Sequence, residues 1–198
     1  MPPLSVSNIP EVSVATSLLF ARNFFRHPRM LGSIVPSSRF LIRELLDPID
    51  WAHARVIVEY GPGIGNVTAQ ILRRLAPAAR LIAIETHGDF VRHLRRHLPD
   101  PRLTVVDGSA ADVARILQDH GHVRASYIIS GIPFSTLPRE QREHILLQSR
   151  AVLEPKGGFV LYQFSGSLFG DLQRVFGNVK RGFELLNVLP AHLFFCTS

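Results

Sequence analysis

The chain has a single cysteine and no long apolar run, and each shortage excludes a class of protein. Cys196 has no second cysteine to pair with, so an internal disulfide is excluded and a reducing cytoplasm is favoured. No apolar run approaches the roughly 20 residues that a membrane-spanning helix needs. The first residues lack the basic start and apolar block of a signal peptide. We therefore expect a cytoplasmic protein that has no membrane-spanning helix.

The composition is that of a folded protein with an anionic partner. The chain has 198 residues, of which 46% are hydrophobic, enough for one domain with an appendage. Its formal net charge of +6 favours nucleic acid or an acidic membrane surface as the partner.

The amino-terminal segment has the pattern of an amphipathic helix. Between Val14 and Pro28, phenylalanines share one side of the helix and arginines lie opposite. Such a helix suits the surface of an anionic membrane, where arginines meet headgroups and phenylalanines enter the boundary. The alternative is that its apolar face packs on the protein's own core. The residues expected to contact the membrane are Phe20, Arg22, Phe24, Phe25, Arg26 and Arg29.

From residue 54 the pattern changes to alternating strands and helices. Short apolar runs rich in branched residues are typical of buried parallel strands. They occupy residues 55–61, 80–85, 102–108, 125–131 and 157–164, and helical patterns cover 38–46, 68–75, 90–98, 112–118 and 139–153. Residues 183–190 and 191–196 resemble a terminal hairpin. The sequence thus predicts a doubly wound α/β fold, with a mostly parallel seven-stranded sheet and an antiparallel terminal strand. We divide the chain into an amino-terminal segment (1–45) and this domain (46–198).

A glycine-rich turn follows the first strand. Gly61, Gly63 and Gly65 allow a tight turn and close approach of the backbone to a ligand. A dinucleotide fingerprint would place its third glycine at position 66, where Asn66 stands. The acid before the turn, Glu59, is placed to face a ligand's ammonium group, directly or through water.

Acids also end the next two strands. Glu85 is placed to accept from both hydroxyls of a ribose, and Asp107 from the amino group of an adenine. In open α/β sheets, ligands bind at this carboxyl edge. The alternative is that these acids cap helices.

These motifs carry a resemblance to known families. The segments VEYGPGIGNVT, AIETHGDF, VVDGSA and SGIPFST, in this order, resemble the rRNA adenine dimethyltransferase branch of the S-adenosylmethionine-dependent methyltransferases. The amphipathic helix with GSIVPSS, then LYQFS and LNVLPAH, look like the bacterial phospholipid N-methyltransferases, to which we assign the chain.

The resemblance implies a class I Rossmann-like fold, with S-adenosylmethionine as methyl donor and S-adenosylhomocysteine as product. It implies methylation of phosphatidylethanolamine, and of its mono- and dimethyl products toward phosphatidylcholine, at the inner face of the cell membrane. Anionic lipids are then expected partners, while nucleic acid and an obligate protein partner are not. The expected donor-binding residues are Ser33, Ser38, Glu59, Gly61, Gly63, Gly65, Glu85, Thr86, Asp107, Gly108, Ser109, Ser130 and Gly131.

The sequence departs from these families in three places. The RNA enzymes have Asn-Leu-Pro-Tyr after the fourth strand, where this chain has SGIPF at 130–134, so the asparagine that positions an adenine amine is missing. Their helical carboxyl-terminal RNA-binding domain is also missing. The phospholipid enzymes often have Asn-x-Pro-Pro-Ala near the end, where this chain has NVLPA at 187–191.

Methylation of an amine requires its neutral form. If the amine resembles that of lysine, with a pKa of about 10.4, neutralising it at pH 7 costs about 4 to 5 kcal/mol. Candidate proton acceptors are Ser130, Tyr162, Gln163 and the backbone carbonyls of Gly131 and Ile132, and we assign Ser130 and Tyr162 as catalytic. The expected substrate-binding residues are Ile132, Pro133, Phe134 and Gln163. Phe134 and Tyr162 either offer ring faces to a methylated ammonium or belong to the core.

Two other functions stay open at this point. One is an RNA or small-molecule methyltransferase that uses the same donor. The other is an inactive membrane-binding protein, against which the intact glycines and acids argue. No metal is expected, because His93 and His97 lie among arginines on a basic helical face without a third ligand nearby.

Overall fold

The computed structural model describes residues 38–185 and 190–197. Ser33 and the six residues expected to contact the membrane lie outside these residues. The predicted helix between Val14 and Pro28 therefore stays a prediction.

The described residues form one seven-stranded sheet of order β3-β2-β1-β4-β5-β7-β6. β7 runs antiparallel to both of its neighbours, and the other pairs are parallel. This confirms the predicted doubly wound fold and its antiparallel terminal strand. The strands are β1 (Val56–Tyr60), β2 (Arg80–Glu85), β3 (Leu103–Asp107), β4 (Ala125–Ser130), β5 (Leu153–Gln163), β6 (Asn178–Glu184) and β7 (Ala191–Thr197).

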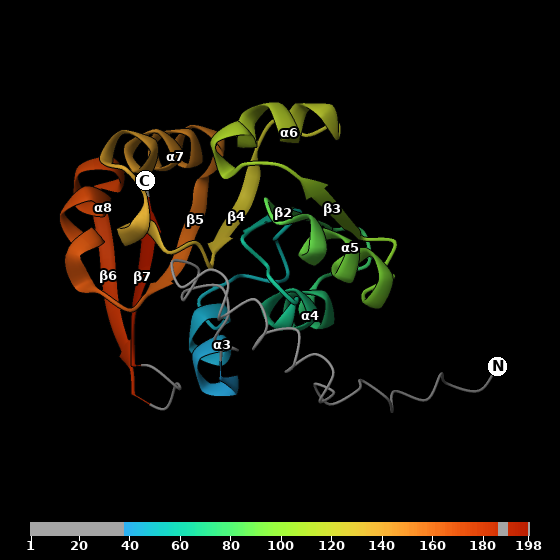
Figure 1. Cartoon of the computed structure of the whole chain (residues 1–198), viewed down its shortest axis with the longest axis horizontal. Helices are drawn as coiled ribbons and strands as arrows, with labels where there is room; N and C mark the ends of the chain where they lie inside the picture. Colours follow the sequence, from blue (N-terminus) through green and yellow to red (C-terminus); the bar gives the residue numbers. More distant parts are fainter. Residues whose placement is uncertain (1–37, 186–189, 198) are drawn as a thin grey trace.

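Helices cover both faces of the sheet (Figure 1). α6 (Val113–Asp119), α7 (Arg139–Val152) and α8 (Phe169–Phe176) pack on one face. α3 (Arg39–Leu46) and α4 (Asn66–Arg74) pack on the other, and α5 (Gly88–His97) contacts β2 and β3. Three short 3-10 helices, η2 (Ala110–Asp112), η3 (Phe134–Thr136) and η4 (Gly166–Leu168), follow β3, β4 and β5.

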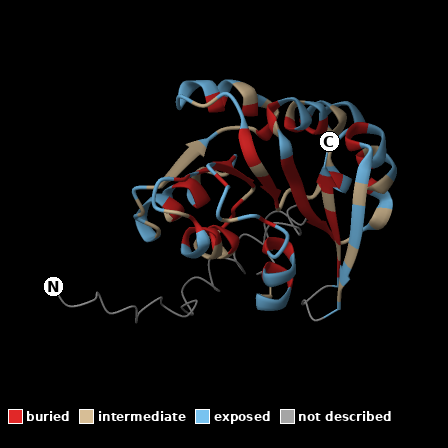
Figure 2. Ribbon diagram, turned by 180° about the vertical axis from the view of Figure 1, so that it is seen from behind, coloured by how far each residue is buried: buried red, intermediate tan, exposed pale blue. Residues whose placement is uncertain are grey.

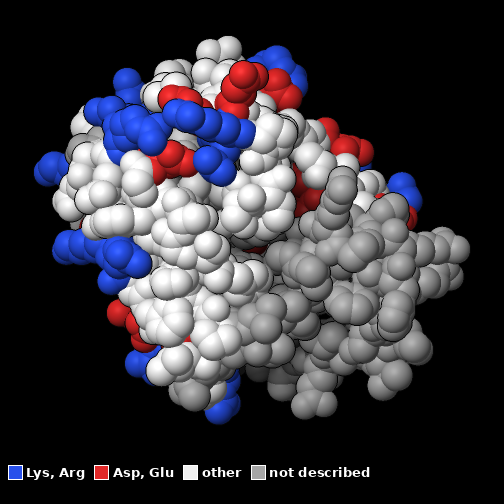
Figure 3. All heavy atoms as spheres, turned by 60° about the vertical axis from the view of Figure 1, so that its left-hand side comes forward, with Lys and Arg blue, Asp and Glu red and all other residues white. Residues whose placement is uncertain are grey.

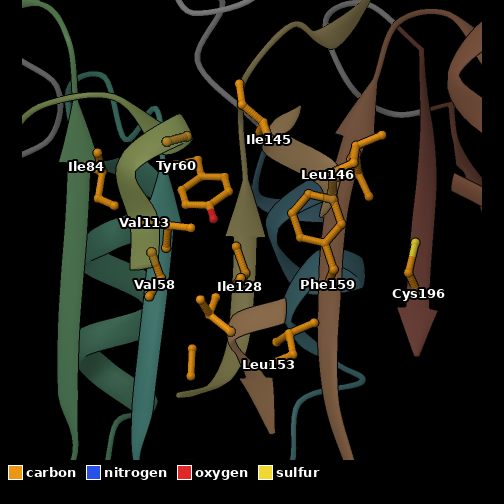
Figure 4. Packing of buried hydrophobic residues seen from close by; sticks show 14 of the residues in the cluster. Val58, Tyr60, Ile84, Val113, Ile128, Ile145, Leu146, Leu153, Phe159 and Cys196 are labelled. Atoms are coloured by element: carbon orange, nitrogen blue, oxygen red, sulfur yellow. The ribbon is translucent and has the colours of Figure 1, made fainter. Parts of the chain in front are cut away.

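Alternation along the strands divides the core into two layers. Val58 and Tyr60 of β1 point toward α6 and α7, together with Phe159 of β5 (Figure 4). Ile57 points to the opposite side, where it joins the buried residues of α3 and α4. The central strands are buried on both faces, while the edge strand β6 is largely exposed (Figure 2). The two-sided burial explains why these strands appear in the sequence as continuous apolar runs.

α3 belongs to this core. The hydroxyl oxygen of Ser38 accepts from the backbone N–H of Leu41 at 3.2 Å and caps the helix. Leu41, Leu45 and Leu46 are fully buried against the sheet and α4. The predicted division at residue 45 falls within this helix, so the described chain packs as one body from α3 onward.

The carboxyl-terminal part differs from the prediction in two elements. α8 is absent from the sequence-based assignment, because an eight-residue helix with a glycine at its second position gives a weak signal. The hairpin exists, but β6 ends at Glu184, whereas the prediction placed that strand at 183–190. The apolar run misplaces this strand, because β6 is largely exposed at the edge of the sheet and has little apolar pattern of its own.

Candidate active site

The candidate site lies where β1 and β4 are neighbours. β1 continues in the chain to β2 on one side, and β4 lies on its other side. Loops that leave such a pair diverge, and the crevice at their carboxyl ends is where open α/β sheets bind ligands. Backbone bonds extend the ladders past the strands, since Gly61 N–H donates to Ile84 O at 3.0 Å and Gly131 N–H donates to Tyr60 O at 2.9 Å. The two loops are thereby held at the same edge.

The glycine turn brings the start of α4 to this edge. Gly65 has a φ of +88° and precedes α4 without capping it through a side chain. A Cβ at Gly65 would lie 2.7 Å from side-chain atoms of two leucines, Leu94 of α5 and Leu98, which directly follows α5. Glycine is thus required here both by backbone conformation and by the close packing of α4 on α5. The first N–H groups of α4 have no acceptor within the helix, and the amino terminus of a helix favours an anionic group.

Glu85 connects the turn to the end of β2. One carboxylate oxygen accepts from Gly63 N–H at 3.1 Å, and the other accepts from His87 N–H at 2.9 Å. The side chain is almost fully buried. These two bonds fix the carboxylate beside the crevice.

Glu59 is a buried acid on the α4 side of β1. It is 2% exposed, and burial raises the pKa of its carboxyl to about 8. The neighbouring charge of Glu85 adds to this increase in pKa, and Thr68 of α4 opposes it. Among the described residues, neither Glu59 Oε2 nor Thr68 Oγ1 has a hydrogen-bond partner of good geometry. With this pKa the carboxyl is mainly protonated at neutral pH, and a ligand's ammonium group beside it would favour the ionised form and satisfy the unpartnered oxygen.

The third acid, Asp107, completes a row across adjacent strands. It ends β3 directly opposite Glu85 in the sheet register and is exposed. Thr86 is also exposed, and Gly108 N–H donates to Glu85 O at 3.0 Å. Ser109 has a local role, because its hydroxyl oxygen accepts from Ala111 N–H and caps η2. The structure thus brings the three predicted acids to one edge.

The loop after β4 faces the glycine turn. A Cβ at Gly131 would lie 3.1 Å from the carbonyl oxygen of Gly61 and 3.4 Å from the hydroxyl of Tyr162. Ser130 is fully buried, and its hydroxyl oxygen accepts from Ile132 N–H at 3.2 Å. Its assignment as a catalytic residue stays a prediction.

A small pocket of about 130 Å³ opens beside this loop. Gln163, at the end of β5, holds the pocket together, because its side-chain N–H groups donate to Ile132 O at 2.8 Å and to Tyr162 O at 2.6 Å. The pocket is lined by Gly131, Ile132, Pro133, Ser135, Tyr162, Gln163, Phe164 and Ser165. Ser135, Phe164 and Ser165 were not expected, although Ser135 directly follows the predicted Phe134 and Phe164 directly follows the predicted Gln163.

Phe134 does not line the pocket. Its side chain is fully buried and packs edge-on against Phe159, with the ring centroids 6.2 Å apart. The core alternative therefore holds for Phe134, whereas Tyr162 reaches the pocket. The prediction that Phe134 binds substrate is corrected, because its ring faces contact the core.

No metal centre is evident in residues 38–185 and 190–197. No group of three potential ligands comes together there, and the rings of His93 and His97 stack on each other at 4.2 Å. None of the helices in these residues is sufficiently long and apolar to cross a bilayer.

Comparison with known proteins places the chain in a family. Residues 22–140 match the model of the ribosomal RNA adenine dimethylases. The chain belongs to this family. It is 34% identical over 180 residues to an ornithine lipid N-methyltransferase from Singulisphaera acidiphila, covering 90% of this chain and 94% of the relative. A ribosomal RNA small subunit methyltransferase A from Clostridium perfringens is 26% identical over 134 residues, which cover 66% of this chain but 44% of that protein.

Solved methyltransferases share the fold. A precorrin-6y C5,15-methyltransferase from Geobacter metallireducens aligns with a TM-score of 0.65 at 15% identity, covering 81% of this chain and 89% of that one. A 1,6-didemethyltoxoflavin-N1-methyltransferase from Burkholderia thailandensis, solved with S-adenosylhomocysteine, aligns with a TM-score of 0.60 at 14% identity, covering 97% and 94%. The chain is an S-adenosylmethionine-dependent methyltransferase, with S-adenosylhomocysteine as its product.

Proposed function

We propose that this methyltransferase transfers methyl groups to the primary amine of a membrane aminolipid. The observation that carries the proposal is the 34% identity, over nearly the full length of both chains, to a protein that methylates ornithine lipid. Phosphatidylethanolamine is the second candidate, favoured by the flanking segments LYQFS and LNVLPAH. Both lipids present a primary amine close to an anionic group.

The donor would occupy the crevice at the ends of β1, β2 and β3. Glu59 suits an ammonium group, because a cation beside its buried carboxyl would lower the pKa and stabilise the ionised form, whose Oε2 has no other partner. Glu85 and Asp107 suit ribose hydroxyls and an adenine amine, and the glycine turn leaves room for the ligand. When bound, S-adenosylmethionine supplies an activated methyl group on a positively charged sulfur. Ser33, in the segment before α3, stays a candidate for closing over it.

The amine would occupy the pocket beside the loop after β4. There Tyr162 and the carbonyl oxygens of Gly131 and Ile132 present acceptors to the amine's protons. Ile132 O already accepts from Gln163, and its second lone pair leaves it able to accept again. Pro133 and Phe164 exclude water on the other side, which favours the neutral amine that the reaction needs. Holding the amine in this pocket supplies orientation, the main contribution that a protein makes to a displacement reaction.

The loop after β4 is a reason to prefer a lipid over RNA. Aligned on the proline that both motifs share, Gly131 stands where the RNA enzymes have an asparagine. Glycine has no side chain, so it lacks the amide that pairs with the edge of a base.

An aminolipid substrate requires access to a membrane surface. We propose that the segment from Val14 to Pro28 lies on the inner face of the cell membrane and brings the active site to its substrate. Its arginines favour anionic lipids and its phenylalanines favour the headgroup boundary.

Lipid analysis of cells tests this function. A host that contains both ornithine lipid and phosphatidylethanolamine would express the wild-type chain or its Glu85→Ala variant. We expect methylated forms of one aminolipid with the wild type and none with the variant. Unchanged aminolipids, together with newly methylated rRNA, would contradict the proposal.

A further inference from the structure

A row of side chains leads from the pocket to the outer edge of the sheet. Gln163 of β5 lies opposite His192 of β7, and His192 lies opposite Phe183 of β6. Neighbouring strands are about 4.8 Å apart, so His192 lies one strand spacing, and Phe183 two, from the end of the pocket. The three residues share the face of the sheet that carries α8, because residues opposite each other across strands point to the same side.

The side chains of Arg181 and His192 approach each other at Gly166. A Cβ built at Gly166, next to the pocket residue Ser165, would lie 3.6 Å from both Arg181 Nη2 and His192 Nε2. Because glycine has no side chain, Gly166 leaves these two nitrogens uncovered. Arg181, Phe183 and His192 line a shallow hollow on this face. The hollow and the pocket are therefore separated by little more than residues 165 and 166.

The guanidinium group of Arg181 is held in place without a carboxylate. It lies over the ring of Phe169 at 4.5 Å from the centroid. Within residues 38–185 and 190–197, every ion pair involves other cations. The charge of Arg181 is thus oriented by an aromatic ring and available to an external anion.

Exposed apolar side chains continue outward from this point. Phe183 is 53% exposed and Leu185 is 68% exposed, among the few large apolar residues of the described chain that face solvent. The face that carries this edge shows broad uncharged areas between separate groups of charged side chains (Figure 3). The order from the pocket outward is therefore polar, cationic and apolar.

We propose that Arg181 and His192 bind the anionic group of the aminolipid whose amine enters the pocket. This inference rests on the proposed function and names the part of the substrate that the hairpin recognises. An aminolipid has the matching order of groups, which is amine, phosphate or carboxylate, then acyl chains. A few bonds separate its amine from its anion, which fits the approach of Arg181 Nη2 and His192 Nε2 to Gly166, the neighbour of the pocket residue Ser165. Phe183 and Leu185 then contact the acyl chains.

Kinetics with two lipids test this inference. One is the aminolipid that the wild type methylates, and the other is a double-chain lipid with a primary amine but no phosphate or carboxylate, both in neutral detergent micelles. Arg181→Met keeps the stem over Phe169 and removes the charge. We expect the ratio of kcat/KM for the first lipid to that for the second to fall about tenfold, because one charge-assisted contact is lost. Arg181→Lys should restore part of it.

Lys180→Met is the matched control, since it removes one charge from the next position of β6, which points away from the hollow. Its ratio should equal that of the wild type. An unchanged ratio in Arg181→Met overturns the inference while leaving the proposed function intact. A wild type that methylates RNA and no aminolipid overturns both. If Arg181→Met does not fold, as judged by its Tm, His192→Gln replaces it with the same expected fall.

Discussion

At the scale of single residues, the structure gives the three predicted acids different environments. Glu85 is fixed by two backbone donors and Asp107 is exposed, but Glu59 is buried without a good partner for one of its oxygens. Such an arrangement is typical of functional sites, where stability is lost so that a ligand can be bound.

We predict that Glu59→Gln makes the unliganded protein more stable at high pH. The pKa of Glu59 is raised from 4.5 to about 8, so the folded state retains a proton that the unfolded chain releases. This contribution to stability is present below pH 4.5 and is lost as pH rises through 8. The variant has no such loss, and its Tm should exceed that of the wild type by more than about 10 °C at pH 9 but by little at pH 5.

Melting curves across this pH range measure the effect. Asp119→Asn, at an exposed acid of α6, is the control and should follow the wild type. In calorimetry, Glu59→Gln should bind S-adenosylhomocysteine more weakly, because the ammonium group loses its counterion. Parallel profiles of Tm against pH for the variant and the wild type would show that ionisation of Glu59 does not destabilise the folded protein.

The position of a residue could be predicted where it depends only on the strand that the residue belongs to. Glu59, Glu85 and Asp107 were assigned correctly to one edge, because parallel strands that follow each other end on the same side. Phe134 could not be placed in this way. Whether its ring faces the pocket or the core depends on Phe159, which is distant in the sequence and packs against it.

At the scale of elements, the site depends on the close approach of two loops. The glycine turn after β1 and the loop after β4 meet at Gly61 and Gly131. A backbone carbonyl forms one side of this contact, and it cannot rotate away as a side chain could.

Gly131→Ala should therefore separate the two loops. Its Cβ would lie 3.1 Å from the carbonyl oxygen of Gly61, so the backbone must move. We expect the affinity for S-adenosylhomocysteine to fall about tenfold and the Tm to fall by about 3 °C, corresponding to about 1 kcal/mol. Gly170→Ala in α8 is the control, because nothing lies within 4 Å of its Cβ. Equal affinities in the two variants would contradict this role of the contact.

The amino-terminal segment gives a second prediction at this scale. Changing Arg22, Arg26 and Arg29 together to glutamate should abolish sedimentation with anionic liposomes. The three arginines contribute roughly 3 kcal/mol to binding at low salt. Affinity for S-adenosylhomocysteine and the Tm should stay close to those of the wild type. Liposome binding that survives the charge reversal would refute the role of this segment as an electrostatic anchor.

Element boundaries were predictable to different degrees. The buried strands β1, β2 and β4 were located within a few residues, because burial on both faces makes them continuous apolar runs. β6 and α8 depend on each other, since α8 packs on β6 and β7 at the open edge of the sheet. Neither has a strong pattern alone, so the sequence could not fix them.

At the scale of the whole molecule, the order of the strands places every part of the site on one edge. The donor site that we propose is at the ends of β1, β2 and β3, the pocket lies at β4 and β5, and the hollow lies at β6 and β7. The alternation of strands and helices predicted this general fold, and the comparisons confirm the family and the donor. The substrate is not fixed by the fold, because the same sheet supports many methyl acceptors.

Methyl transfer by the purified protein tests the central claim most directly. The protein would be incubated with S-adenosylmethionine carrying a deuterated methyl group, and with ornithine lipid, phosphatidylethanolamine and small-subunit rRNA in one mixture. Mass spectrometry then follows the label in each acceptor. We predict label on the amine of one aminolipid, none on the RNA, and none anywhere with Glu85→Ala. Label on rRNA adenines with both lipids unlabelled would contradict the account.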